Sequence, residues 1–225
     1  MSLAFLSPVA GETAAPRSPL ADAAIAAGAK LELREGWQLP VSFGDPAAEA
    51  ATCRETVGFA DLSHLTKLER RQKTGAAGSF ESGVARRADG AWHCPVAPGL
   101  GLAICEPDRG DATRASLDGD GVRILDLSGA LGALALAGPL AREVFARFCA
   151  LDLRESRLPV GGFRPGSVAR TPGYVLREAD ERFLMVFGSA YGNYVWETVS
   201  DAAHHLGGGP VGLDALPPIE ETPNA

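Results

Sequence analysis

The order of hydrophobic and polar residues predicts strands in several stretches of the chain. Residues Lys30 to Arg34 alternate, Glu35-Gly36 turns the chain, and Trp37 to Phe43 can pair back, which predicts a hairpin. Residues Ala133 to Ala137 are apolar at every position and predict a buried strand. Further strands are predicted at residues 67–70, 92–96, 100–105, 122–127, 167–171, 174–177 and 183–187.

Helices are predicted where apolar residues recur on one helical face or where flanking residues start or stop a helix. Asp45-Pro46 is a start signal, because Asp accepts hydrogen bonds from free N–H groups and proline fits the first helical position. The helix that follows is predicted from Ala47 to Thr56, with Gly58 as its stop signal. Further helices are predicted at residues 20–27, 107–120, 140–148 and 191–204, and a Gly/Pro loop at 157–166.

These elements do not alternate strictly enough for a doubly wound parallel sheet. From Ala133 onwards the order is strand, helix, strand, strand, helix, which favours an α+β fold with helices packed on one face of a mainly antiparallel sheet. Residues 1–19 are predicted to form an extended N-terminal arm, residues 20–215 one domain, and residues 216–225 a C-terminal tail.

Composition and charge narrow the function classes. The chain has 225 residues, 46% of them apolar, and a net charge of −7, which argues against nucleic acid and anionic membrane surfaces as partners. The first residues lack a basic region and no stretch reaches the roughly 20 apolar residues of a membrane span, so we expect a cytoplasmic protein. The four cysteines show no CxxC spacing, so we expect reduced thiols and no metal.

Short clusters of reactive residue types give no catalytic motif. Asp61-Leu62-Ser63-His64 holds a carboxylate, a hydroxyl and an imidazole, but an extended segment puts His64 on the opposite face from Asp61 and Ser63. A turn tied by the Asp and Ser side chains is favoured over a nucleophilic triad. His93 and Cys94 likewise face opposite sides of a strand, so structural packing is favoured there, and no catalytic residue is predicted.

Two groups of motifs resemble the glycine-cleavage T-protein, or aminomethyltransferase, superfamily. The first is Gly36-Trp37-Gln38-Leu39-Pro40-Val41 with Val57-Gly58-Phe59-Ala60-Asp61-Leu62-Ser63-His64. The second is Leu136-Ala137-Gly138-Pro139-Leu140 with Tyr191-Gly192-Asn193-Tyr194-Val195-Trp196-Glu197, and it is closest in pattern to the sarcosine oxidase gamma subunit, a short relative of the T-protein. The resemblance covers residues 18–215, is poor over residues 72–120, and implies a T-protein-like folate-binding fold with tetrahydrofolate as cofactor.

The chain departs from that family at its two acidic positions. Where the family has Gly-Gly-x-x-Asp-Asp, this chain reads Gly90-Ala91-Trp92-His93-Cys94-Pro95-Val96, and a displaced acid, Glu81 or Asp89, is the alternative. Where the family has a pterin-binding Glu after a Phe, Leu184 follows Phe183. A leucine cannot accept the pterin N–H groups, and each one left unpaired costs about 1–3 kcal/mol.

The resemblance, together with the missing acidic residues, implies a non-catalytic or weakly folate-binding accessory subunit in folate-linked one-carbon metabolism. Such a chain would serve beside larger flavoprotein and folate enzyme subunits in oxidative demethylation of sarcosine or a similar N-methyl amine. The alternative is a free-standing tetrahydrofolate-binding enzyme, an aminomethyltransferase. In that enzyme Trp92, Tyr174 or Trp196 would stack on the pterin, and Arg170 or Arg177 would pair with the glutamyl carboxylate. Core packing is favoured for Trp196, and a structural domain without folate is the third possibility.

Overall fold

The computed structural model describes residues 15–72 and 83–219. The predicted N-terminal arm is therefore described only from Ala15, and the predicted tail only as far as Ile219. Glu81, one of the two candidate displaced acids, lies outside the described residues.

Strands dominate the described part of the chain. They are β1 (Lys30–Arg34), β2 (Trp37–Ser42), β3 (Gly58–Asp61), β4 (Thr66–Gln72), β5 (Arg86–Ala88), β6 (Ala91–Ala97), β7 (Leu100–Cys105), β8 (Val122–Asp126), β9 (Leu131–Ala137), β10 (Phe163–Val168), β11 (Thr171–Ala179), β12 (Arg182–Gly188) and β13 (Gly209–Pro210). The helices are α1 (Ala21–Ala26), α2 (Pro46–Glu55), α3 (Gly110–Leu117), α4 (Ala141–Phe148) and α5 (Gly192–His204).

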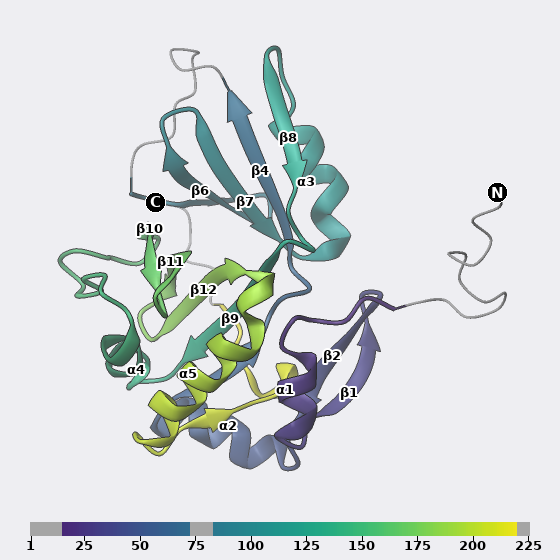
Figure 1. Ribbon diagram of the computed structural model, residues 1–225. Helices are drawn as coiled ribbons and strands as arrows, with labels where there is room; N and C mark the ends of the chain where they lie inside the picture. The colour runs from purple at the N-terminus through teal and green to yellow at the C-terminus, as the bar shows by residue number, and fades with distance from the viewer. Residues whose placement is uncertain (1–14, 73–82, 220–225) are drawn as a thin grey trace, which may run out of the picture.

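The strands form three sheets, and in Figure 1 the five-stranded sheet lies above the six-stranded one. The six-stranded sheet has the order β10-β11-β12-β9-β3-β13, and the five-stranded sheet has the order β5-β6-β7-β4-β8. Among the named strands, all pairings are antiparallel except the short one between β13 and β3. The α+β class with mainly antiparallel sheets is therefore confirmed.

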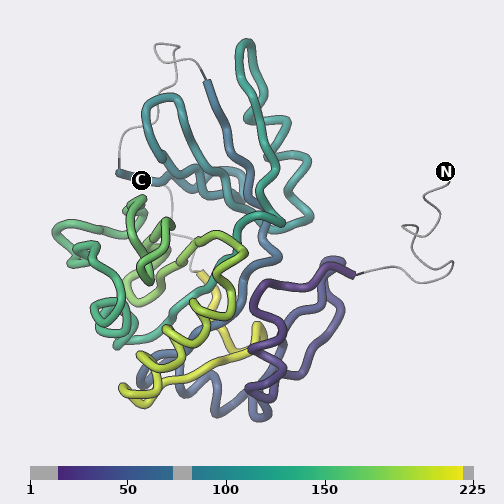
Figure 2. Tube along the Cα trace, in the orientation of Figure 1, coloured from purple at the N-terminus to yellow at the C-terminus, as the bar shows by residue number. Residues whose placement is uncertain are grey.

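Strand β9 shows how one apolar segment serves two cores. Its leucines, Leu134 and Leu136, pack with α1, α4 and α5 on one side of the six-stranded sheet. Its alanines Ala133 and Ala135 face the five-stranded sheet on the other side. Residues that alternate along a strand point to opposite faces, so the large and small side chains sort onto different sides. The backbone trace in Figure 2 follows this strand through the middle of the six-stranded sheet.

Predicted and observed elements agree best where a cap or a turn signal marks the boundary. The Asp45 side chain accepts hydrogen bonds from Ala47 N and Ala48 N at 2.9 and 3.3 Å, so the predicted cap of α2 is confirmed. The predicted loop over residues 157–166 is wrong in its second half, because β10 begins at Phe163. This is an edge strand, and an edge strand tolerates the proline and glycine that led to the loop prediction.

The C-terminal segment closes the molecule against its N-terminal part. The buried Glu49 carboxylate on α2 accepts hydrogen bonds from Ser42 Oγ at 2.9 Å, from Phe43 N at 2.7 Å and from Gly212 N at 2.7 Å. A Cβ atom at position 212 would lie 2.0 Å from the carbonyl oxygen of Val41, so only glycine fits this approach. Among the described residues, no helix is long and apolar enough to cross a bilayer.

Candidate functional site

The space between the two large sheets is apolar at its centre. Leu176 and Leu184 of the six-stranded sheet meet Cys94, Leu102 and Ile104 of the five-stranded sheet in one buried cluster. Tyr174 and Trp92 are partly buried and pack against the same cluster. We call this region the inter-sheet space.

A group of charged side chains lies at one end of the inter-sheet space. Glu178 and Arg182 flank the turn between β11 and β12, and Arg182 Nε donates to Glu178 Oε2 at 3.0 Å. Burial raises the pKa of Glu178, and the Arg182 charge opposes that rise. Arg182 also donates to the carbonyl oxygen of Pro217, so the C-terminal segment reaches this end of the space. We call these two side chains the buried pair.

The buried pair lies near Cys94 of the five-stranded sheet. Burial raises the pKa of Cys94 well above its ordinary value, and the nearby charge of Glu178 raises it further. The charge of Arg87 in turn lowers the pKa of Glu178, less strongly than that of Arg182. The Glu178 carboxylate is therefore close enough to β5 and β6 to interact electrostatically with Arg87 and Cys94.

His64 and Glu106 lie at the solvent edge of this charged end. His64 is buried and its Nε2 lies 3.6 Å from Glu106 Oε2, whereas the Glu106 side chain is 61% exposed. A hydrogen bond with His64 lowers the pKa of Glu106, and the Arg182 charge adds to that lowering. Nδ1 of His64 is buried and has no hydrogen-bond partner among the described residues. Glu106 is thus the solvent-exposed member of this charged end.

Two further buried nitrogen atoms lack an acceptor at this end. They are Nη1 of Arg87 on β5 and Nε1 of Trp92 on β6, neither of which has a partner among the described residues. More than nine in ten buried polar groups in proteins are hydrogen-bonded. These orphaned donors therefore mark a position that suits an acceptor-bearing ligand.

The Asp61–His64 segment forms the side-chain-tied turn that its sequence predicts. Ser63 N donates to Asp61 Oδ1 at 2.9 Å, and the Ser63 hydroxyl bonds to the backbone of Ala133. The fully buried Lys67 ammonium donates to the carbonyl oxygens of Ser63 and Leu65 at 2.7 and 2.8 Å. Burial lowers the pKa of Lys67 to about 8, although Asp61 and Asp126 favour the charged form. These groups fix the turn and do not form a nucleophilic triad.

The positions where the family resemblance expects acids are occupied by other side chains. Leu184 is fully buried in the inter-sheet cluster. Cys94 is also fully buried there, and His93 points to the other face of β6. Asp89, the candidate displaced acid inside the described residues, is exposed in the β5–β6 turn with φ +51°. A pterin edge would therefore find no free carboxylate at Leu184.

The five side chains predicted to bind a ligand do not gather in one place. Trp92 and Tyr174 both border the inter-sheet space, and Tyr174 stacks on Phe163 with ring centroids 5.4 Å apart. Trp196 packs on the opposite side of the six-stranded sheet, edge-on to Phe59 at 5.2 Å. Their assignment as ligand-binding residues stays a prediction.

The two arginines among those five residues have other surroundings. Arg177 is buried and donates to the carbonyl oxygens of Leu158 and Asp180. Arg170 is exposed in the turn between β10 and β11, with φ +58°. Sequence reasoning missed Glu178, Arg182 and Arg87, because two of them sit beside an apparent surface hairpin and the third in a weakly patterned segment.

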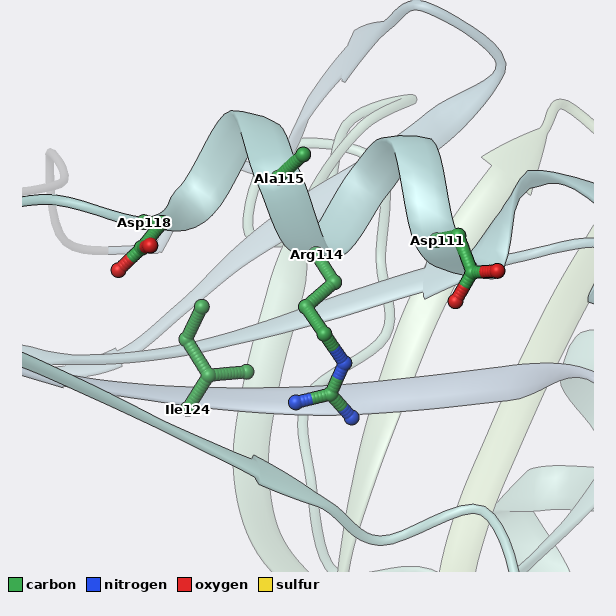
Figure 3. Close-up of a pocket in the computed structure, with 5 residues that line it drawn as sticks. All are labelled: Asp111, Arg114, Ala115, Asp118 and Ile124. Carbon is green, nitrogen blue, oxygen red and sulfur yellow. The ribbon is translucent and has the colours of Figure 1, made fainter.

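A separate hollow lies between α3 and β8 on the outer side of the five-stranded sheet (Figure 3). Its volume is about 370 Å³, and Asp111, Arg114, Ala115, Asp118 and Ile124 line it. Arg114 pairs with the exposed Asp126 at 3.4 Å. Within residues 15–72 and 83–219, no group of three His, Cys, Asp or Glu side chains is arranged to hold a metal ion.

Comparison with curated proteins connects the chain to aminomethyltransferases, while no family model matches it. It is 25% identical over 231 aligned positions to an aminomethyltransferase of Desulforamulus reducens, which covers 88% of this chain and 61% of the relative. A shorter match to an aminomethyltransferase of Chromobacterium violaceum is 42% identical over 57 residues. The chain thus spans less than two thirds of the length of these relatives.

Solved structures identify the fold. The glycine cleavage system aminomethyltransferase T from Bartonella henselae superposes with a TM-score of 0.73 and 17% identity, over 90% of this chain and 61% of that one. A chain of the heterotetrameric sarcosine oxidase from Corynebacterium sp. U-96 superposes with a TM-score of 0.61 and 21% identity, over 74% of this chain and 94% of that one. The T-protein-like fold predicted from the motifs is therefore confirmed.

Proposed function

We propose that this chain, which has a T-protein-like fold, is an accessory subunit of a larger enzyme in folate-linked one-carbon metabolism. The observation that carries the proposal is Leu184. This side chain is fully buried at the position where the resemblance places a pterin-binding acid. Without that acid the fold keeps its shape, but the pterin N–H groups lose their fixed acceptor.

A structural neighbour also supports this proposal. A chain of a heterotetrameric sarcosine oxidase shares the fold with a TM-score of 0.61. We infer an association with larger flavoprotein subunits that oxidise sarcosine or a similar N-methyl amine. In that assembly folate binding by this chain is weak or absent.

Exposed apolar side chains offer a place for such a partner. Ile25 on α1 and Tyr194 on α5 are each exposed by more than two fifths, and the two helices pack against each other. Tyr191, immediately before α5, is equally exposed. Exposed aromatic and aliphatic side chains on neighbouring elements favour an interface with another protein.

Isolation of the tagged full-length chain from its native cells tests the accessory role. We expect a second chain with a flavin absorbance spectrum to copurify in a fixed ratio and to oxidise sarcosine or a related N-methyl amine. A Tyr194→Glu variant should reduce copurification, whereas Leu33→Glu, on the β1–β2 hairpin, serves as a control. A single chain that transfers an aminomethyl group to tetrahydrofolate without a partner would overturn the proposal.

The second candidate function is a free-standing folate-dependent aminomethyltransferase. Glu178 favours it, because burial raises the pKa of this carboxyl and groups with perturbed pKa values are candidates for proton transfer. Tetrahydrofolate titration by calorimetry separates the two functions. Tight binding that is lost in Glu178→Gln supports the enzyme, and the absence of heat at millimolar ligand excludes it.

A further inference from the structure

We propose that the edge of β8 that faces away from β4, together with the hollow beside it, docks an extended, basic segment of another polypeptide. We call this side of β8 the outer edge. The segment adds to the five-stranded sheet as a further strand and seats its side chains between α3 and β8. This inference goes beyond the proposed function and depends neither on folate nor on a flavoprotein. The surface also differs from that of Ile25 and Tyr194, whose helices cover the six-stranded sheet.

Strand β8 is the last strand of its sheet. Its partner is β4, and among the described residues neither a strand nor an isolated bridge pairs with the outer edge. The edge strand β10 of the other sheet differs, because Val84 bridges to Gly162 beside its start and Cys149 bridges to Val168 at its end. Strand β8 also contains no proline or lysine, which commonly protect such edges. The outer edge can therefore accept an added strand.

The backbone groups available at the outer edge follow from the ladder between β4 and β8. Leu127 N donates to the carbonyl oxygen of Lys67 at 2.8 Å, in register with the pairs of that ladder. In an antiparallel pair every second residue directs its N–H and C=O groups to the partner strand, so Leu125 faces β4. Ile124 and Asp126 therefore direct theirs to the outer edge, where an added strand can bond to them.

The side chains of these two residues lie on the face of the sheet that α3 covers. Ile124 packs against the cluster that contains Leu117 of α3, and Asp126 pairs with Arg114 of α3 at 3.4 Å. Ile124 also lines the hollow of about 370 Å³ between α3 and β8 (Figure 3). Side chains that are directly opposite one another on paired strands share a face. A residue bonded to Ile124 thus places its side chain in this hollow.

The lining of the hollow favours a segment with both apolar and basic side chains. Ile124 and Ala115 supply apolar surface. Asp111 lies in the first turn of α3 and Asp118 immediately follows its end, and both are exposed. Among the described residues no basic side chain forms an ion pair with either carboxylate, whereas Arg114 is already paired. The hollow therefore has excess negative charge, which lysine or arginine side chains would complement.

The spacing of the two carboxylates suits alternate residues of a strand. Asp111 and Asp118 are roughly 10 Å apart along the helix, at 1.5 Å per residue. Strand residues four positions apart lie on one face at about 13 Å, and long lysine side chains can adjust to the difference. An apolar residue midway between them would face Ile124. A second copy of this chain would instead bring the same carboxylates together, and like charges disfavour that pairing.

NMR titration of the isotope-labelled full-length protein with synthetic peptides tests the proposal. The probe is the capped peptide Thr-Lys-Thr-Val-Thr-Lys-Thr, whose sequence is the same in both strand directions. We expect it to bind, and the matched peptide with glutamate in place of both lysines should bind about tenfold more weakly. The lysine peptide N-methylated at its three central residues keeps the charges but loses backbone donors, and should bind about fivefold more weakly.

Substitution of the two carboxylates in the hollow tests the charge assignment. The variant Asp111→Asn/Asp118→Asn should weaken binding of the lysine peptide by about tenfold. The matched control is Glu143→Gln/Glu197→Gln, which removes two exposed carboxylates from α4 and α5 and changes the net charge equally. This control should leave binding unchanged.

The positions of the shifted signals test strand addition itself. The backbone amide signals of Ile124 and Asp126 should move downfield with the lysine peptide, whereas that of Leu125, which faces β4, should move much less. This comparison uses the wild-type protein, so it does not depend on how well a variant folds.

Four results would overturn the proposal. They are equal affinity for the lysine and glutamate peptides, equal shifts at Ile124 and Leu125, no binding at millimolar lysine peptide, and movement of the Ile124 and Asp126 signals with protein concentration alone. In the last case a second copy of the chain occupies the outer edge. The accessory role proposed above is tested separately by copurification.

Discussion

The two faces of the six-stranded sheet are filled in different ways. The face covered by α1, α4 and α5 holds aromatic rings in contact, such as Phe145 and Phe183 at 5.6 Å. The face toward the five-stranded sheet holds mainly aliphatic side chains, one stacked ring pair of Phe163 and Tyr174, and charged side chains at one end. Each face also holds a guanidinium: Arg177, over the Phe183 ring on the first face, pairs with the exposed Asp180, whereas Arg182 on the second pairs with the buried Glu178. Substitutions on the two faces should therefore fail for different reasons.

The largest expected effect belongs to the helix-covered face. Phe183→Ala removes a ring that is almost completely buried between Phe145 and its neighbours, and large-to-small changes of this kind cost about 3–5 kcal/mol. Urea unfolding measures the loss. Leu125→Ala, at a side chain that is 40% exposed on β8, should stay within about 0.5 kcal/mol of wild type. A loss at Phe183 below 1 kcal/mol would contradict tight packing on this face.

The buried pair gives the next largest effect and distinguishes the two faces. Glu178→Leu leaves the Arg182 guanidinium without its carboxylate and should destabilise the protein by about 3 kcal/mol. The double variant Glu178→Leu/Arg182→Met removes both charges and should recover most of that loss. If the double variant is as unstable as the single one, the region behaves as a packed core, and the contrast between the faces disappears.

Lys67 should make stability depend on pH in the alkaline range. Its pKa is about 8 in the folded protein and ordinarily 10.5, so the unfolded chain binds more protons between these values. Stability should therefore rise by about 2 kcal/mol between pH 7 and pH 9.5, because the folded state no longer holds a buried ammonium. Lys67→Met lacks this group, so the difference between variant and wild type isolates its contribution. An unchanged difference over that range would refute the lowered pKa.

The smallest effect is expected outside both faces. Asp45→Ala removes the cap of α2 and should cost about 1 kcal/mol. Asp45→Asn keeps an oxygen acceptor, so its loss of stability should be only a few tenths of the loss in Asp45→Ala. Thermal unfolding of the two variants measures the difference, which should not change when the Glu178→Leu substitution is also present. If the effects of the Asp45 and Glu178 substitutions on stability are not additive, α2 and the charged end are energetically coupled.

Local signals in the sequence determined much of the fold. Strand β9 was predicted from five consecutive apolar residues, because a strand buried on both sides is apolar at every position. Helix α2 was predicted from Asp45-Pro46, because helix capping depends on a few adjacent residues. The extent of β10 was missed because Pro165 and Gly166 resemble a loop unless the strand is known to lie at a sheet edge.

The candidate site was harder to derive than the fold. Glu178 and Arg182 flank a polar turn, and such residues are normally solvated. Their burial depends on the five-stranded sheet and on Pro217, which lie far away in the sequence. The resemblance to aminomethyltransferases showed that Leu184 stands where the family has a pterin-binding acid. Periodicity alone could not have shown which face of β12 would contact a ligand.

The carboxylate of Glu49 connects two parts of the chain that are synthesised at very different times. Its partners Ser42 and Phe43 precede it closely, but Gly212 follows it by 163 residues. On the ribosome, an N-terminal half that has already collapsed must leave a carboxylate oxygen and a glycine-sized gap beside Val41 open until residue 212 emerges. Native closure therefore cannot precede synthesis of Gly212, and nascent chains arrested before residue 212 should remain sensitive to protease.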